Sequence, residues 1–178
     1  MKSLIISPHP DDEVLGAGGT LFKRKSSKKS NSLYWIIVTK LQANTPRIKV
    51  LRRKNEIKKI SKLFGFKKVF QLDFNTTELD SSSKKRLIKD FSDIFKKIKP
   101  YELFVPHFSD VHSDHKIVSE VISTCTKNFR FPFIKKILSY EVLSETDYNL
   151  NRKKIFFPNY YEDISKFITK KKECNENI

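Results

Sequence analysis

Residues 4–13 read Leu-Ile-Ile-Ser-Pro-His-Pro-Asp-Asp-Glu, an apolar run that stops at a proline and leads into a histidine and three acidic residues. The apolar run 4–7 predicts a buried strand that ends in a loop at Pro8. The acidic residues are typical of the first turn of a helix, where they complement the helix dipole. The stretch therefore predicts a strand, a loop and a helix in that order.

The rest of the chain repeats this alternation of strand and helix. Apolar and β-branched runs predict strands at 33–39, 69–72, 103–105 and 134–143. Helical spacing of apolar residues predicts helices at 47–64, closed by Gly65, at 87–98, closed by Pro100, and around 117–122 and 164–171. The polar segment 23–31 is expected to be a surface loop. The sequence thus predicts one α/β domain of the doubly wound class, with a parallel sheet covered by helices on both faces.

Length and composition fit a single packed domain. The chain has 178 residues, of which 38% are hydrophobic and 12% aromatic, which argues against wholesale disorder. Its two cysteines, Cys125 and Cys174, exclude a disulfide framework and favour a reducing compartment, so we expect a cytoplasmic protein. The apolar N-terminal stretch is too short for a signal peptide, and no uncharged apolar run approaches the roughly 18 residues of a membrane span.

The charge balance is strongly basic. Lys and Arg number 36 against 20 Asp and Glu, a formal net charge of +16, which favours anionic partners such as nucleic acid, phosphorylated small molecules or an acidic membrane surface. The basic residues are scattered along the whole chain and lack the interleaved aromatics of a base-stacking surface. This pattern favours solvated helix faces over a specific nucleic-acid site and leaves contact with a membrane surface open.

Two clusters of metal-competent residues follow predicted strands. The first, at 8–13, follows the strand at 4–7, and the second, at 110–115, follows the strand at 103–105. In open parallel sheets ligands bind beyond the carboxyl ends of the strands. We therefore expect the two clusters to meet at one edge of the sheet, although they are far apart in the sequence.

These clusters contain the ligand set of a catalytic zinc ion, which takes three protein ligands and one water. His9, Asp12 and His115 supply that set, and bound zinc would lower the pKa of its water to about 7. Asp11 is the best-placed carboxylate to take the water proton. A lone histidine after a strand is more often structural, but three of the four histidines fall within the two clusters. The fourth, His107, is interpreted as a wall or outer-shell residue.

The same residues resemble the signatures of the PIG-L/LmbE-like family of zinc-dependent N-deacetylases. Residues 9–13 match the family's His-Pro-Asp-Asp-Glu, and residues 112–115 match its His-x-Asp-His. Arg53 and Glu56 fit an Arg-x-x-Glu pair on a helix that ends at Gly65. Residues 140–142 and 157–165 are also similar, so the resemblance runs from about residue 1 to 171.

The resemblance implies a Rossmann-like three-layer sandwich with a mostly parallel sheet, formed by residues 1–178 as one deacetylase domain. It also implies hydrolysis of an N-acetyl group from an amino sugar, usually an N-acetylglucosamine unit of a larger molecule, in glycoconjugate or surface polysaccharide synthesis. The implied cofactor is Zn²⁺, and such sites also accept other divalent metals. The basic surface would suit a phosphate- or nucleotide-linked sugar.

Roles for single residues follow from the resemblance by position. His9, Asp12 and His115 resemble the zinc ligands, and Asp11 resembles the general base. His112 resembles the histidine that stabilises the oxyanion, where a protonated imidazole would act beside the zinc. Arg53 resembles a substrate-binding arginine, and we assign Asp114 to substrate binding with it.

Two features of the sequence depart from the family pattern. Thr76 stands where a family Asp is often found, which predicts different sugar recognition. Many members continue past the position of Ile178, which predicts a cleft that is more open, completed by a partner subunit, or impaired. A homo-oligomer is compatible with this sequence. The alternatives to an amino-sugar deacetylase are the same hydrolase acting on another small amide, such as a thiol-sugar precursor, and a non-catalytic module that binds anionic glycan or nucleic acid.

Overall fold

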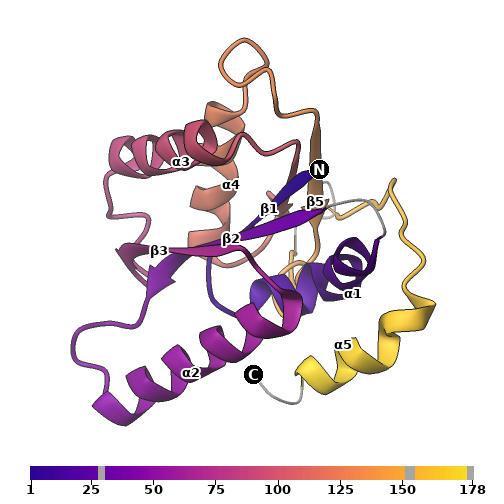
Figure 1. The fold of residues 1–178 in the computed structure, drawn as a ribbon. Helices are drawn as coiled ribbons and strands as arrows, with labels where there is room; N and C mark the ends of the chain where they lie inside the picture. Colours follow the sequence, from indigo (N-terminus) through magenta and orange to yellow (C-terminus); the bar gives the residue numbers. More distant parts are fainter. Residues whose placement is uncertain (28–30, 151–154, 176–178) are drawn as a thin grey trace.

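The computed structural model describes residues 1–27, 31–150 and 155–175, which form a sheet of five strands with helices packed on it (Figure 1). The strands are β1 (Lys2–Ser7), β2 (Ser32–Lys40), β3 (Lys68–Asn75), β4 (Glu102–Pro106) and β5 (Lys136–Tyr140). The helices are α1 (Asp12–Ser26), α2 (Arg47–Phe64), α3 (Lys84–Ile98), α4 (Ser113–Cys125) and α5 (Ile168–Asn175), which follows the short 3₁₀ helix η2 (Ser165–Phe167). None of the described helices is both long and apolar enough to cross a membrane.

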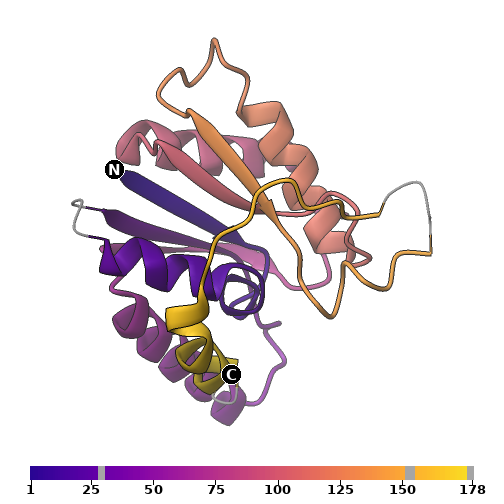
Figure 2. The same ribbon diagram turned by 90° about the vertical axis from the view of Figure 1, so that its right-hand side faces the viewer.

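The strands lie in the order β3-β2-β1-β4-β5, and every neighbouring pair is parallel. Figure 2 shows the sheet between two helical layers, with α1, α2 and α5 on one face and α3 and α4 on the other. Alternate residues of the central strands enter the two cores: Ile5 and Trp35 pack under α1 and α2, whereas Leu4 and Ile36 pack under α3 and α4. The predicted three-layer parallel α/β fold is confirmed.

Most predicted elements are confirmed, and two need correction. Helix α2 has the expected bounds, and Gly65 caps it in the left-handed conformation at φ 67°. Strand β5 is shorter than predicted, at Lys136–Tyr140. Residues 23–26 form the last turn of α1 and not a loop, because Arg24 of that turn pairs with the buried Glu102 of β4. Residues 28–30 of the expected loop lie outside the described residues.

Glycines in α1 allow the chain after β5 to approach the helix closely. A Cβ on Gly16 would lie 2.2 Å from Cδ2 of Tyr140 and 2.8 Å from the backbone oxygen of Glu141. Tyr140 is buried, and its hydroxyl donates to the carbonyl of Ile6 in β1 at 2.8 Å. The absence of a side chain at Gly16 therefore fixes the position of α1, whose first turn carries the acidic cluster.

We expect Gly16→Ala to destabilise the protein by about 1–3 kcal/mol, because the new methyl group overlaps a buried ring and a backbone oxygen. Gly18→Ala on the same helix is the control, because its Cβ would find no atom closer than 3.6 Å. That change should be neutral or stabilise by up to about 1 kcal/mol through helix propensity. Urea unfolding of both variants measures the difference, and equal stabilities would contradict the close-approach argument.

The segment that leads into α5 is held against α1 by ion pairs. Oε2 of Glu162 lies 2.5 Å from Nζ of Lys23, and Oε1 lies 2.7 Å from Nη1 of Arg24. Partial burial raises the pKa of Glu162, but hydrogen bonds with Lys23, Tyr160 and Arg24 outweigh this effect and lower it to about 2. The ionised carboxylate is therefore favoured by the folded state.

We expect Glu162→Gln to lower the free energy of unfolding by about 1–3 kcal/mol at neutral pH. The contribution of Glu162 is complete above its unfolded pKa of about 4.3 and is lost as the pH falls toward its folded pKa. The difference between wild type and variant should therefore shrink between about pH 4.3 and the folded value. Urea unfolding at pH 6 and at about pH 3 tests this; a difference that does not change with pH would contradict it.

Candidate metal centre and active site

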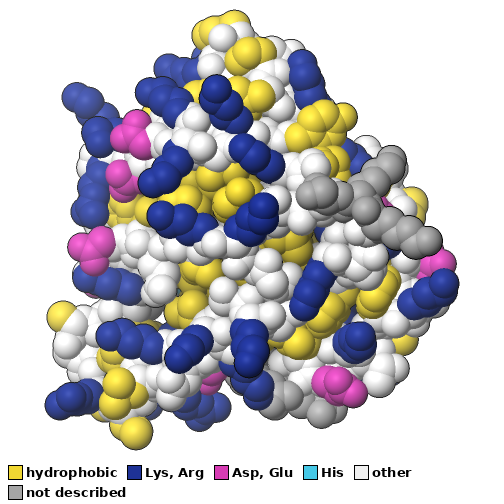
Figure 3. Space-filling view, viewed as in Figure 1, with side chains coloured by type: hydrophobic (Ala, Val, Ile, Leu, Met, Phe, Trp, Pro, Cys, Tyr) yellow, Lys and Arg dark blue, Asp and Glu magenta, His cyan; other side chains and the backbone are white. Residues whose placement is uncertain are grey.

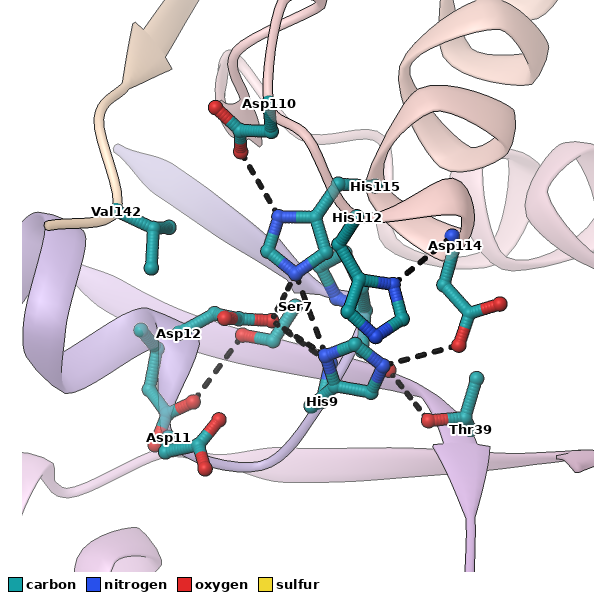
Figure 4. Close-up of polar contacts among 12 residues, drawn as sticks. Ser7, His9, Asp11, Asp12, Thr39, Asp110, His112, Asp114, His115 and Val142 are labelled. Atoms are coloured by element: carbon teal, nitrogen blue, oxygen red, sulfur yellow. Dashed lines mark hydrogen bonds and ion pairs between the residues drawn. The ribbon is translucent and has the colours of Figure 1, made fainter. Parts of the chain in front are cut away.

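Two loops meet at the carboxyl edge of the sheet, as the sequence predicts. The loop after β1 carries His9 and leads into α1, and the loop after β4 carries Asp110 and leads into α4. These loops are neighbours because β1 and β4 pair directly, with Leu4 opposite Leu103. Figure 4 shows the side chains of both loops pointing toward one another.

Three side chains in this cluster converge on one point: His9, Asp12 and His115. Nε2 of His115 lies 3.3 Å from Nδ1 of His9 and 3.4 Å from Oδ2 of Asp12, and the third separation, between His9 and Asp12, is 3.7 Å. Tetrahedral zinc with bonds of about 2.0–2.2 Å holds its ligand atoms about 3.3–3.6 Å apart. Two of the three separations fall within this range and the third, at 3.7 Å, lies just above it, so the three atoms are spaced closely enough to share one zinc ion.

The burial of this group also favours a cation. The side chains of Asp12 and His115 are 4% and 0% exposed, and that of His9 is 17% exposed. Burial, followed by the charge of Asp11, raises the pKa of Asp12 well above its ordinary value. A carboxylate that is costly to ionise without a counter-charge is suited to a bound divalent ion.

Each candidate histidine ligand has a carboxylate behind it. Nε2 of His9 lies 3.0 Å from Oδ2 of Asp114, and Nδ1 of His115 lies 2.8 Å from Oδ2 of Asp110. The other oxygen of Asp110 accepts from the Thr146 hydroxyl at 2.6 Å. Such carboxylates fix the orientation of a ligating imidazole and raise its basicity. In both histidines they leave the opposite ring nitrogen facing the shared point.

Asp114, which we expected to bind substrate, lies behind the site. It is fully buried, and its carboxylate accepts from the backbone N–H groups of Thr77 at 2.8 Å and Leu79 at 3.2 Å, besides contacting His9. These hydrogen bonds outweigh the effect of burial and lower its pKa. Asp114, His9 and His112 form a second group of metal-ligand type. The group of His9, Asp12 and His115 fits a metal better, because both Asp114 oxygens already accept hydrogen bonds from other groups of the protein.

His112 lines the cavity in front of the candidate metal group. Its Nδ1 accepts from the backbone N–H of Asp114 at 3.1 Å, so this nitrogen carries no proton. Burial, followed by the charge of His9, lowers the pKa of His112. The structure therefore favours a neutral imidazole that donates from Nε2, in place of the protonated imidazole expected from the sequence.

Asp11 and Arg53 stand on the other side of the same cavity. Nη1 of Arg53 donates to the Pro10 carbonyl at 2.6 Å and lies 3.6 Å from Oδ2 of Asp11, while Nε lies 3.4 Å from Glu56. Their side chains are 30% and 31% exposed, respectively. Arg53 thus belongs to the cavity wall and also holds the loop that carries His9 and Asp11, while its role in binding substrate stays a prediction.

The cavity has a volume of about 600 Å³, enough for a sugar and part of its substituent. Its polar wall includes Thr76, which stands where a family Asp was expected, and Glu145. Its apolar wall comes from α1 and α2 and includes Leu15, Val50 and Ile57. The cavity therefore offers both hydrogen-bonding and apolar surface next to the metal group.

Sequence reasoning missed several residues that support the site. Asp110 lies within the second predicted cluster, five residues before His115, and that spacing was the available signal. Thr146 and Glu145 follow β5 in a segment with no recognisable motif. His107, expected as a wall or outer-shell residue, is buried, shares a hydrogen bond of 2.5 Å with Ser109 and is not among the residues that line the cavity.

A parallel α/β sheet that carries a His–Asp–His group of this spacing at its carboxyl edge defines a Rossmann-like α/β protein with a candidate site for one metal ion. A sequence model of the PIG-L family, described as GlcNAc-PI de-N-acetylase, matches residues 4–126, and the chain belongs to this family. The resemblance drawn from residues 9–13 and 112–115 is thereby confirmed.

Individual relatives agree with this family. A diacetylchitobiose deacetylase of Thermococcus kodakarensis is 31% identical over 124 residues, which cover 65% of this chain and 45% of the relative, so the match spans less than half of that protein. Among solved structures, the conserved protein TT1542 of Thermus thermophilus has a TM-score of 0.74 at 23% identity, covering 98% of this chain and 77% of its own. An N,N'-diacetylchitobiose deacetylase of Pyrococcus horikoshii, in complex with an inhibitor, has a TM-score of 0.72 at 24% identity, covering 99% and 68%. At these identities the two structures show a shared fold.

The arrangement of ligands and supporting carboxylates generates a prediction about metal affinity. We expect wild-type protein to bind one Zn²⁺ per chain and His115→Ala to lose that binding. Asp114→Asn should keep the stoichiometry but bind zinc about 10–100-fold more weakly, because His9 loses its charged partner. Competition with a chromophoric chelator measures both quantities.

Asp80→Asn is the matched control for Asp114→Asn, because Asp80 is an exposed residue of the same β3–α3 connection. It should bind zinc as the wild type does. Circular dichroism establishes that all variants are folded. Unchanged affinity in a folded Asp114→Asn protein would show that this carboxylate does not support the metal site.

Proposed function

We propose that this chain, as one domain over residues 1–178, is a zinc-dependent hydrolase that removes the N-acetyl group of an amino sugar. The observation that carries the proposal is the convergence of His9, Asp12 and His115 within 3.3–3.7 Å of one another, at the wall of a cavity that Asp11 and His112 also line. Membership in the PIG-L family and the deacetylase activity named for the relatives support it.

In this proposal His9, Asp12 and His115 hold the metal. A zinc ion bound there supplies Lewis acidity, which acidifies water and polarises the acetyl carbonyl. Asp11 accepts the proton of the attacking water as the new C–O bond forms. Arg53 positions this base, because it holds the carbonyl of Pro10 and faces the Asp11 carboxylate.

His112 donates a hydrogen bond from Nε2 to the carbonyl oxygen as negative charge develops on it. Its other nitrogen is occupied by the backbone N–H of Asp114, which fixes the ring in the donating orientation. The C–N bond then breaks, and Asp11 returns its proton to the leaving nitrogen. The products are acetic acid and the amino sugar, which become acetate and an ammonium group when the acid gives its proton to the amine, so atoms and protons balance and Asp11 is again a carboxylate.

The cavity supports a substrate larger than a monosaccharide. Its apolar wall suits the ring face or aglycone of a glycoconjugate, and the family description and the relatives name N-acetylglucosamine-type substrates. Lys54 is exposed at this wall and forms no ion pair with any residue that the structure describes. We infer that Lys54 contacts a phosphate, so a phosphate- or nucleotide-linked amino sugar in glycoconjugate synthesis is the favoured substrate.

The complete set of ligands, base and oxyanion donor favours this enzyme over a non-catalytic binding module, which needs none of them. Cys125 and Cys174 are both free and buried, which supports the expected reducing compartment, the cytoplasm. The homo-oligomeric state stays a prediction.

The test is acetate release by zinc-loaded protein from N-acetylglucosamine, diacetylchitobiose and UDP-N-acetylglucosamine. We expect turnover of at least one of them and preference for the phosphate-linked sugar. Asp11→Asn should reduce kcat by about 10²–10⁴-fold, because the variant cannot accept the water proton. Its zinc content should stay at the wild-type level, since Asp11 is not in the ligand group.

Asp80→Asn carries the same chemical change outside the cavity and should retain wild-type activity. A metal-loaded wild type that releases no acetate, while the Thermococcus kodakarensis relative does so in the same assay, would refute the proposal. Full activity of Asp11→Asn would refute the assigned base and leave the metal site in place.

A further inference from the structure

The outer face of α2 combines exposed aliphatic side chains with positive charge. Ile57, Ile60 and Phe64 of this helix are buried against the sheet. On the outside, Ile48 and Leu51 are 73% and 46% exposed. Exposed aliphatic residues that gather on one helix face and are rimmed by charged side chains are typical of an interaction surface.

The charge of α2 is almost entirely of one sign. Its only acidic residue is Glu56, whose carboxylate is already paired with Arg52 at 2.9 Å and Arg53 at 3.4 Å. The basic residues of the helix are Arg47, Lys49, Arg52, Arg53, Lys54, Lys58, Lys59 and Lys62. Figure 3 shows Lys and Arg side chains around hydrophobic ones over α2, at the lower left of the view. The outer face of α2 is therefore positively charged and also exposes aliphatic side chains.

A groove continues this face between α2 and α5. It has a volume of about 470 Å³, and its apolar lining includes Phe22 of α1, Leu63 of α2 and Phe167 of η2. Lys25, Lys59 and Lys170 also line the groove together with one acidic residue, Glu173, so the charged groups around the apolar floor are mainly cationic. The combination suits a molecule with an anionic head and an apolar body.

We propose that the outer face of α2, together with the groove between α2 and α5, docks on the surface of an anionic lipid bilayer. Basic amphipathic helices lie in the plane of such surfaces, with aliphatic residues among the headgroups and Lys and Arg near the lipid phosphates. Here Ile48 and Leu51 would lie among the lipid headgroups, and Lys58 and Lys62 would lie near the lipid phosphates. Nucleic acid fits this face less well, because α2 has no exposed aromatic residue for base stacking and phosphates gain nothing from aliphatic neighbours.

Docking in this way places the active-site cavity at the membrane. The N-terminal half of α2 that carries Ile48 and Leu51 also contributes Val50 and Arg53 to the cavity wall. A bilayer bound along this helix would therefore meet the mouth of the cavity. The proposal concerns binding and does not depend on the deacetylase reaction.

The experiment is co-sedimentation of the full chain with vesicles of equal parts phosphatidylcholine and phosphatidylglycerol, and with vesicles of phosphatidylcholine alone. We expect binding to the anionic vesicles that weakens with salt and little binding to the neutral ones. Ile48→Ser combined with Leu51→Ser, and Lys58→Glu combined with Lys62→Glu, should each weaken binding at least about tenfold. None of these residues lies in the proposed metal or catalytic group, so zinc content and activity on a water-soluble substrate should be unchanged.

Lys85→Glu combined with Lys97→Glu is the matched control, because it removes the same charge from exposed positions of α3 on the opposite layer. It should bind anionic vesicles as the wild type does. Equal loss in the two charge-reversed proteins would overturn the proposal, since attraction would then depend on net charge alone. The proposal also fails if the Ile48/Leu51 variant binds normally, or if anionic vesicles do not bind wild-type protein.

Discussion

Parallel pairing of β1 with β4 is the constraint on which the candidate metal centre depends. The two strands run side by side with Ile5 opposite Phe104, so their carboxyl ends release two loops at neighbouring positions. His9 and His115 are separated by more than a hundred residues, yet their ring nitrogens lie 3.3 Å apart. No contact between residues near in sequence could bring them together. The connections through α1, α2 and α3 do so, because the crossovers between parallel strands of a twisted sheet all have the same handedness. The chemistry of the site is therefore set by the topology of the sheet.

Carboxylates then convert proximity into defined geometry. Asp110 and Asp114 lie on the second loop and at the start of α4, and each is fully buried beside one candidate histidine ligand. Because each takes up one ring nitrogen, each imidazole presents its other nitrogen to the shared point. Arg53 acts in a comparable way on the other side, where it holds the loop backbone at Pro10. The cavity is thus bordered by side chains that have few alternative conformations.

The sequence predicted the architecture and the residues that converge, but not the support behind them. Apolar runs and helical spacing identified the alternation of strand and helix, and α2 has the predicted bounds, because the repeats of helix and strand are local and show directly in the sequence. The position of Asp114 beside His9 could not be predicted in this way, because the direction in which this carboxylate points depends on the angle at which α4 meets the sheet. The last turn of α1 was missed because the partners of Arg24, Glu102 and Glu162, are distant in the chain. The roles of Asp11, His112 and Arg53 stay predictions.

Asp114 links the position of His9 to the conformation of the loop at Thr77, two features that could otherwise change separately. Its carboxylate contacts His9 and also holds the backbone N–H of Thr77, a β-branched residue at φ 65°, next to Thr76 in the cavity wall. Left-handed backbone costs such a residue about 1–3 kcal/mol, and the hydrogen bond from Thr77 offsets part of that cost. In evolutionary terms, a loop of the cavity wall is coupled to a candidate metal ligand. Mutations that reshape this loop would also perturb His9, which restricts the order in which changes in the cavity wall could accumulate within the family.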